Sequence, residues 1–380
     1  MKEISNEFKL LIEASQITPS ANHIHAYIDE GLRSEYLLDL ARANGVLPLI
    51  YHELRHYPQY TISDEIKEAV QEIKNTNFFM SAQLLQLIYL LQEKGINILP
   101  IKGPILAEHA YKDLGLRPFS DLDILAKETN LQEIADTLIA MGYHNEKELS
   151  TLSHPYILQN FSDLSFTHPD TGLIIELHWK LLKSAQAELS DISQLFERQI
   201  TINFQNTQLP SLPLEEEFLY LCVHAAKHRF ERIEWMNDLN RLYELYHKRF
   251  DWEKLLLLAK HEAYTNAYLL ALSILKSHFN RSFSKTTHHL LHKKKIKKLH
   301  QKVFDLHADD YVLKKKKEGI RWMELSFSLQ LEENLYRKLI VLKSTLFPLY
   351  MDDIIKIKKL PKFLGLLYYL SRLKRILGFK

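Results

Sequence analysis

The stretch Arg117-Pro-Phe-Ser-Asp-Leu-Asp-Ile-Leu-Ala126 decides the fold, because in it two carboxylates stand at the head of an apolar run. The run has the character of a strand. Successive strand side chains point to opposite faces of a sheet, so Asp121 and Asp123 share one face and Leu122 points to the other. Carboxylates at the mouth of a sheet offer the oxygen ligands that Mg²⁺ prefers. The stretch therefore predicts a strand that carries a site for a divalent metal ion.

A second strand-like run, Gly172-Leu-Ile-Ile-Glu-Leu-His-Trp179, supplies a third acid, Glu176. The residues Asp170-Thr-Gly172 before it are typical of a hairpin turn. A strand with two acids beside a strand with one acid suggests two-metal phosphoryl or nucleotidyl transfer. We predict that Asp121, Asp123 and Glu176 bind metal and are catalytic. His178 lies two residues after Glu176 and shares its face, where it either lines the cleft or makes a structural hydrogen bond.

A phosphate-binding turn is indicated at Lys102-Gly103, between the strand-like residues 96–101 and the helix-like residues 105–111. Backbone N–H groups at a strand–glycine–helix turn can contact phosphate oxygens. Arg117 and Ser120 lie on the loop just before the first acid, where both side chains can also reach a phosphate. We predict that these four residues bind the nucleotide.

Together these motifs resemble the DNA polymerase β-type nucleotidyltransferase superfamily, and more closely the bacterial uncharacterised nucleotidyltransferase family. The resemblance covers roughly residues 40–250, in the family's order. It rests on Gly95-Ile96, Lys102-Gly103, Tyr111, Arg117 with Asp121-Leu-Asp123, Gly142-Tyr143, Glu176-Leu-His-Trp179, and His224, His228, Trp235 and Asp238-Leu239.

The resemblance implies a metal-dependent nucleotidyltransferase that uses two Mg²⁺ ions. Such an enzyme moves an NMP group from a Mg-bound nucleoside triphosphate to a hydroxyl-type acceptor on a small molecule, sugar, peptide or protein. The chain departs from the superfamily pattern in having Lys102-Gly103-Pro104 where Gly-Ser is common, and Glu176 where Asp is more familiar. The alternative is therefore a catalytically degenerate nucleotidyltransferase fold that acts as a nucleotide-sensing or partner-binding module.

A second polar cluster occupies a helix-like stretch further along. His224 and His228 are four residues apart and share a helix face, with Lys227 beside them. The sequence His-Ala-Ala-Lys-His lacks the Glu of a His-Glu-x-x-His zinc site, which argues against a metalloprotease. The family resemblance implies instead that His224, Lys227, His228 and Asp238 border the cleft. A structural role inside a polar interface is an equal alternative for the histidines.

We expect an α+β fold, in which a small mixed β-sheet forms the nucleotidyltransferase core between N-terminal and C-terminal helical regions. The apolar positions of residues 131–140 recur with helical spacing, and Asn130 is a reasonable cap for that helix. Four regions are predicted: an N-terminal helical region (1–95), the catalytic core (96–205), a helical region bordering the cleft (206–280) and a basic helical C-terminal region (281–380).

Composition narrows the class of protein further. The only cysteine of the chain, Cys222, lies in an apolar run and is expected in the core, which excludes a disulfide framework and a cysteine-rich zinc site. The first residues carry charges throughout and do not resemble a secretory signal, and no window of about twenty residues is apolar enough to span a membrane. We therefore expect a cytoplasmic protein.

The charge is unevenly distributed along the chain. Residues 281–380 contain 24 Lys and Arg against 9 Asp and Glu, whereas residues 1–280 contain 25 against 38. The leading interpretation is that the basic runs are solvated helix faces. For the apolar and basic stretch 360–378 we expect a terminal helix that docks on its own domain, with an anionic membrane surface as the second candidate. A nucleic-acid partner is disfavoured, since this region lacks the interleaved aromatic residues of single-strand platforms.

Overall fold

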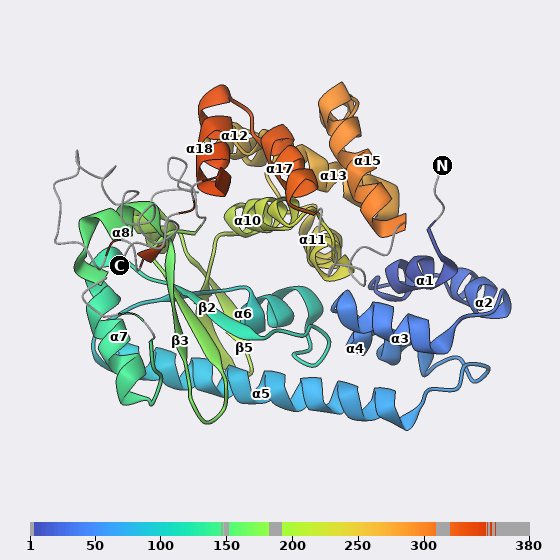
Figure 1. Cartoon of the computed structure of the whole chain (residues 1–380). Coiled ribbons are helices and arrows are strands. Elements are labelled where there is room, and N and C mark those ends of the chain that lie inside the picture. Colours follow the sequence, from blue (N-terminus) through green and yellow to red (C-terminus); the bar gives the residue numbers. More distant parts are fainter. Residues whose placement is uncertain are drawn as a thin grey trace, which may run out of the picture.

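A mixed four-stranded sheet with the order β1-β2-β4-β3 lies at the centre of the fold, between a long helix on one side and a layer of helices on the other (Figure 1). The structure is a computed structural model and describes residues 4–145, 147, 152–181, 192–308, 320–346, 348, 350, 351 and 354. The fold is α+β, as expected. The strands of the sheet are β1 (Leu99–Ile101), β2 (Asp121–Leu125), β3 (Asp163–Thr167) and β4 (Ile174–His178).

The two acidic strands are direct neighbours in this sheet. β2 runs parallel to β4, with Asp123 opposite Glu176 and Leu125 opposite His178, while β1 and β3 pair antiparallel on the outer sides. β3 and β4 form a hairpin whose turn includes Asp170-Thr-Gly172, which confirms that prediction. The parallel register therefore brings acids from distant parts of the sequence to one face.

The opposite face of the sheet is apolar and packs on helices. Leu122 and Ile124 of β2 are buried in one cluster with the second half of α5 (Asp64–Glu93) and with α7 (Leu131–Ala140). α7 confirms the amphipathic helix expected over 131–140, although the Asn130 side chain makes no cap hydrogen bond. α5 runs the length of the molecule beneath the sheet (Figure 1); its buried residues lie in the second half, while Ile66, Val70 and Ile73 of the first half are partly buried against the other apolar cluster. Shorter elements of this part are α6 (Gly103–Leu106), the π-helical turn η1 (Ala107–Tyr111), η2 (Glu128–Asn130), α8 (Pro155–Asn160) and α9 (Ile192–Glu197).

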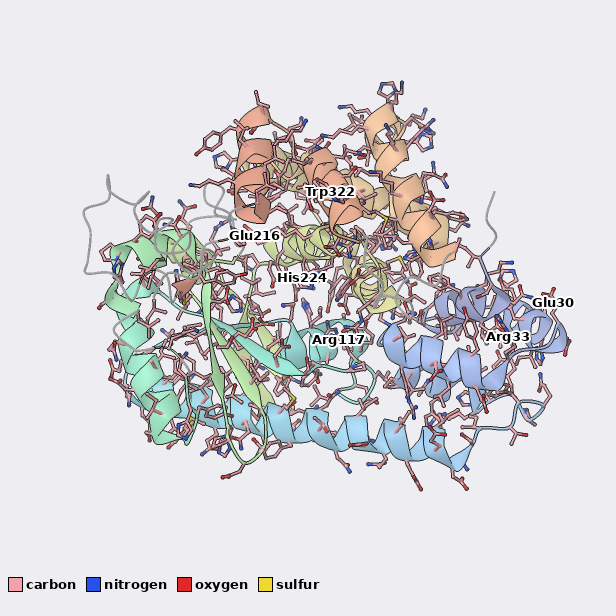
Figure 2. The ribbon with its side chains drawn as sticks, viewed as in Figure 1. Glu30, Arg33, Arg117, Glu216, His224 and Trp322 are labelled. Atoms are coloured by element: carbon pink, nitrogen blue, oxygen red, sulfur yellow. The ribbon has the colours of Figure 1, made fainter. Side chains whose placement is uncertain are left out.

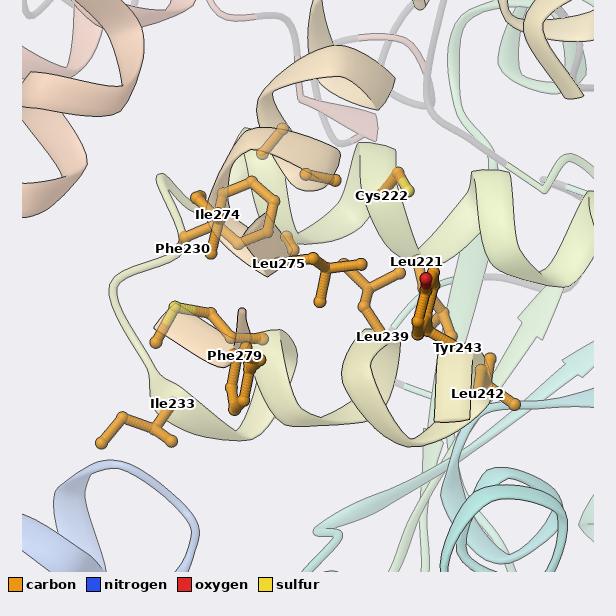
Figure 3. Packing of buried hydrophobic residues seen from close by; sticks show 14 of the residues in the cluster. Leu221, Cys222, Phe230, Ile233, Leu239, Leu242, Tyr243, Ile274, Leu275 and Phe279 are labelled. Carbon is orange, nitrogen blue, oxygen red and sulfur yellow. The ribbon is translucent and has the colours of Figure 1, made fainter. Parts of the chain in front are cut away.

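A second apolar cluster joins the N-terminal helices to the helices after the sheet. Its centre is formed by α10, α11 and α13, where Leu221, Leu239 and Leu275 are fully or almost fully buried (Figure 3). Cys222 is fully buried there, as predicted. The helices that contribute to or surround this cluster are α1 (Asn6–Ala14), α2 (Ala21–Asp29), α3 (Ser34–Ala43), α4 (Leu47–Leu54), α10 (Leu214–Lys227), α11 (Ile233–Tyr246), α12 (Trp252–His261), α13 (Thr265–Phe279), α14 (Lys285–Leu291), α15 (Lys294–Ala308), α17 (Ile320–Leu331) and α18 (Leu335–Leu346).

One hairpin was not anticipated from the sequence. β5 (Ile200–Phe204) and β6 (Thr207–Ser211) pair across Gln205-Asn206, and both turn residues have positive φ, as a tight two-residue hairpin requires. Strand residues thus continue past 206, where the sequence analysis expected helix. The division into four regions stays a prediction, and buried contacts cross it because the N-terminal helices share their core with α10, α11 and α13.

Across the described ranges, no helix combines the length and the hydropathy required to cross a bilayer. The stretch 360–378, considered above for contact with a membrane surface, lies outside the described residues.

Asn44 joins the N-terminal helices to the start of α11. Its Oδ1 accepts the N–H of Ile233 (3.0 Å), its Nδ2 donates to the Leu40 carbonyl (2.8 Å), and its own carbonyl accepts the N–H of Glu234 (3.1 Å). Asn44 is fully buried, so water cannot replace these bonds. The side chain therefore satisfies backbone groups of two elements far apart in sequence.

We expect Asn44→Ala to lower the free energy of unfolding by about 1–3 kcal/mol, the cost of leaving buried polar groups unpaired. The exposed Asn75 on α5 provides a matched control, since Asn75→Ala should change stability by less than about 0.5 kcal/mol. Urea unfolding of both variants measures the difference. Equal midpoints for the two variants would show that the Asn44 bonds contribute nothing net.

Candidate active site

Asp123 is the centre of the acid cluster. Its Oδ1 lies 2.8 Å from His178 Nε2, and its Oδ2 lies 3.0 Å from Lys102 Nζ. His178 Nε2 also lies 3.4 Å from Glu176 Oε2. Asp123 is buried and Glu176 is partly exposed, so the cluster has a closed inner side and an open outer side. The structure thus brings Lys102, Asp123, Glu176 and His178 together.

Three of these side chains can share one metal ion. Ligand atoms of Asp123, Glu176 and His178 lie within 4.8 Å of one another, which is the only such group of three or more among the described residues. Carboxylate oxygens and an imidazole nitrogen suit a divalent cation. Asp121 is on the same face of β2 but outside this group, so the observed cluster has His178 where the sequence analysis placed Asp121.

The charge states of the cluster follow from burial and from close partners. Burial would raise the pKa of Asp123, but Lys102 and then His178 outweigh it and hold that pKa below its usual range. Burial would lower the pKa of His178, yet its hydrogen bonds to Asp123 and Glu176 raise it to about 9. For Asp121, burial and the neighbouring Asp123 raise the pKa. At neutral pH the centre therefore holds an ionised Asp123 between two cations.

The turn between β1 and α6 places Lys102 in this cluster. Lys102 has φ 53° and ψ −143°, a conformation that L-residues rarely adopt, and Gly103 follows with φ 43°. A non-glycine residue held in such a conformation costs about 1–3 kcal/mol. A Cβ on Gly103 would lie 3.5 Å from the Asp121 carbonyl, an ordinary contact, so glycine is favoured there by its φ and not by lack of space. The ion pair with Asp123 offsets the strain at Lys102.

Arg117 lies away from the cluster in a second buried network. Its guanidinium pairs with both oxygens of Asp238 on α11, at 2.8 and 2.9 Å, and lies 3.3 Å from Glu234. The Tyr111 hydroxyl donates to the same Asp238 carboxylate (2.7 Å). The structure therefore joins two predicted site residues, Arg117 and Asp238, to each other. Ser120, the remaining residue of the predicted nucleotide set, is exposed next to Asp121.

Helix α10 lies beside Lys102 of the cluster. Tyr220 lies with its ring centroid 5.8 Å from Lys102 Nζ, and His224 is one turn further along the same face, on the side of α10 that looks toward α6 (Figure 2). Burial, and next the Lys102 ammonium, hold the pKa of His224 well below its usual range. His228 is exposed beyond it, with Lys227 half-buried.

Sequence analysis missed Tyr220. The sequence did contain a pattern that includes this residue. Rings recur at intervals of four residues at Tyr220, His224 and His228, so they share one helix face. A tyrosine in an apolar run gives no sign of polar function by itself, and only its proximity to Lys102 in the fold identifies it.

Comparisons with known proteins bear on the family to which this chain belongs. A family model described as uncharacterised nucleotidyltransferase matches residues 31–280. No curated protein matches the sequence. Two solved structures are similar at low identity. A lincomycin-bound lincosamide antibiotic adenylyltransferase, LnuA, is 15% identical, with 43% of this chain and 97% of that chain covered and a TM-score of 0.30. An antigenic nucleotidyltransferase-like protein from Paracoccidioides brasiliensis is 11% identical, with 53% and 93% covered and a TM-score of 0.32.

TM-scores this low support no conclusion about the arrangement of this chain. The family model, in contrast, covers more than half of the 380 residues and includes every residue of the acid cluster. The predicted resemblance is confirmed: the chain belongs to the uncharacterised nucleotidyltransferase family.

Proposed function

We propose that the protein is a metal-dependent enzyme that transfers an NMP group from a nucleoside triphosphate to a hydroxyl-type acceptor, with release of pyrophosphate. The observation that carries the proposal is the cluster on two parallel strands, where Asp123 and Glu176 are paired in register and Lys102 reaches Asp123 from the strand–helix turn. A buried carboxylate, a partly exposed one and a cation on one face of a sheet suit phosphoryl-type chemistry.

The donor set fits a divalent cation. Asp123, Glu176 and His178 would hold one ion, and His178 would release its ring proton as the metal binds, because only the neutral imidazole is a ligand. Asp121 would share in holding a second ion in the proposed two-Mg²⁺ arrangement. Bound there, the metal would neutralise charge on the triphosphate and lower the pKa of the acceptor hydroxyl. The carboxylates among the ligands also suit Mn²⁺.

The side chains of the chain have separate roles in this proposal. The Lys102 ammonium would bind the triphosphate oxygens, with the Gly103 N–H beside it. The acceptor oxygen would form a bond to the α-phosphorus as the bond to pyrophosphate breaks, and Glu176, which is partly exposed, would accept the hydroxyl proton. The acceptor stays open among a small molecule, sugar, peptide or protein.

Arg117 is better suited to positioning than to phosphate binding. Three of its contacts are carboxylate oxygens of α11, so a phosphate would have to displace an ion pair that is almost fully buried. This pairing fixes the loop before β2 against α11 and so orients the strand that bears the acids.

One observation favours the alternative, a nucleotide-sensing or partner-binding module. Lys102 and His178 together occupy both carboxylate oxygens of Asp123, which leaves the carboxylate charge compensated by the protein itself. Such a module would bind a nucleotide without needing a metal ion.

The two functions differ in their response to Asp123→Asn. For the enzyme we expect a loss of roughly 10²–10⁴-fold in pyrophosphate release, since several kcal/mol of charge stabilisation disappear. Asp136→Asn on α7, an exposed acid, should leave the rate unchanged. Calorimetry with ATP, in Mg²⁺ and in chelator, completes the test: equal affinities in the two media would favour the sensing module.

The third acid is tested by changing its length and then its charge. Glu176→Asp retracts the carboxylate by about 1.5 Å, one carbon–carbon bond, and a misplacement near 1 Å can cost about a hundredfold in rate. Glu176→Gln removes the proton acceptor and should abolish nearly all turnover, with little change in thermal midpoint. Full turnover of Glu176→Gln would remove this residue from the mechanism.

The two roles considered for Arg117 predict different results for Arg117→Lys. A positioning role predicts a free energy of unfolding lower by about 1–3 kcal/mol, because Lys keeps the charge but cannot bond both Asp238 oxygens, and an unchanged KM for the nucleotide per folded molecule. A phosphate contact predicts a raised KM at nearly unchanged stability. Steady-state kinetics and urea unfolding on the same preparation separate the two.

A further inference from the structure

Four rings form a continuous strip that leads from the acid cluster to solvent. We call Tyr220, His224, His228 and Trp235 the ring strip. It begins at Tyr220, 5.8 Å from Lys102 Nζ, and continues to His224 with ring centroids 6.1 Å apart. His224 lies 4.8 Å from His228 and 5.6 Å from Trp235, and the last two rings are 5.0 Å apart.

Burial decreases outward along the ring strip. Tyr220 is buried, His224 and Trp235 are half-buried, and His228 is exposed. If the rings served only as core, neighbouring residues would bury all of them. Here the rings at the outer end of the strip remain accessible to solvent. Arg232 extends the same surface, with its guanidinium 5.6 Å from the centre of the Trp235 ring while it also pairs with Glu234.

We propose that the outer ring strip, formed by His224, His228 and Trp235, binds the nucleobase of the nucleoside triphosphate. This inference rests on the proposed function, because it takes Lys102 to hold the phosphates of the same molecule. The inference adds a site for the base, at the opposite end of the nucleoside triphosphate from the phosphates.

The chemistry of the ligand matches the order of groups along the strip. A nucleoside triphosphate has anionic phosphates at one end and a planar aromatic base at the other. The site offers an ammonium group at its inner end and aromatic faces, flanked by a guanidinium, at its outer end. Stacking of a base on an aromatic ring contributes to the binding affinity. It does so for different bases, because every base has a π-face. Stacking of this kind predicts similar affinities for ATP and GTP.

The experiment compares two double variants of the full chain that differ only in whether the rings are kept. His224→Leu with His228→Leu removes both rings, whereas His224→Phe with His228→Phe retains them; His289→Leu, an exposed imidazole on α14, is the control. Calorimetry in Mg²⁺ measures binding of ATP and, separately, of inorganic tripolyphosphate, which has no base. Thermal midpoints establish that each variant is folded.

We expect the double Leu variant to bind ATP roughly 5- to 100-fold more weakly, with tripolyphosphate affinity within about twofold of wild type, and the double Phe variant to keep ATP binding. Unchanged ATP affinity in the double Leu variant overturns the inference, and so does an equal loss for ATP and tripolyphosphate. Normal ATP affinity with impaired transfer would assign the ring strip to the acceptor and overturn the inference too. If the wild-type protein binds neither ATP nor tripolyphosphate, the proposed function itself is wrong, and the inference about the ring strip falls with it.

Discussion

The burial of one ionised carboxylate, Asp123, sets the requirements that the surrounding structure meets. A buried charge without partners is strongly destabilising, so the fold must bring cations to it. Lys102 reaches one oxygen from a strained turn and His178 reaches the other from the adjacent parallel strand. Both partners depend on the sheet: β1 delivers the turn, and the register of β4 delivers the imidazole. A sheet built for packing alone would place apolar side chains here.

The same principle explains the second network. Arg117, Glu234 and Asp238 are all buried, and each is acceptable there only because the others are present. This network connects the loop before β2 to α11, and Asn44 connects α11 to the N-terminal helices. The loop before the acid strand is therefore held by polar contacts with α11, and α11 in turn by Asn44, so helical regions at some distance in sequence become part of what orients the site.

Alternation within a strand is a local property, which is why the sequence could predict that Asp121 shares a face with Asp123, and Glu176 with His178. The helix over 131–140 and the hairpin before Glu176 were accessible because helical spacing and turn residues are local properties too, whereas the fold class also drew on the family resemblance. The partner of Arg117 was not, because Asp238 lies 121 residues away and the pairing exists only once α11 has docked. Tyr220 was hidden by its apolar neighbours, and the β5–β6 hairpin by Gln205-Asn206, a pair without the glycine that marks such turns. Whether the predicted site residues act in catalysis stays a prediction.

In the proposed function, Lys102 would have two alternative partners. In the structure its ammonium pairs with Asp123 and lies beside the Tyr220 ring, so the strained turn and the buried acid stabilise each other. In the proposed complex, phosphate oxygens would compete with Asp123 for that ammonium, while metal would take over the compensation of the carboxylate. The two ligands would then favour each other's binding, because each satisfies a charge that the other releases. Under the proposed function, the contacts of a single lysine would thus link the compensation of the buried Asp123 charge to the binding of a metal–triphosphate pair.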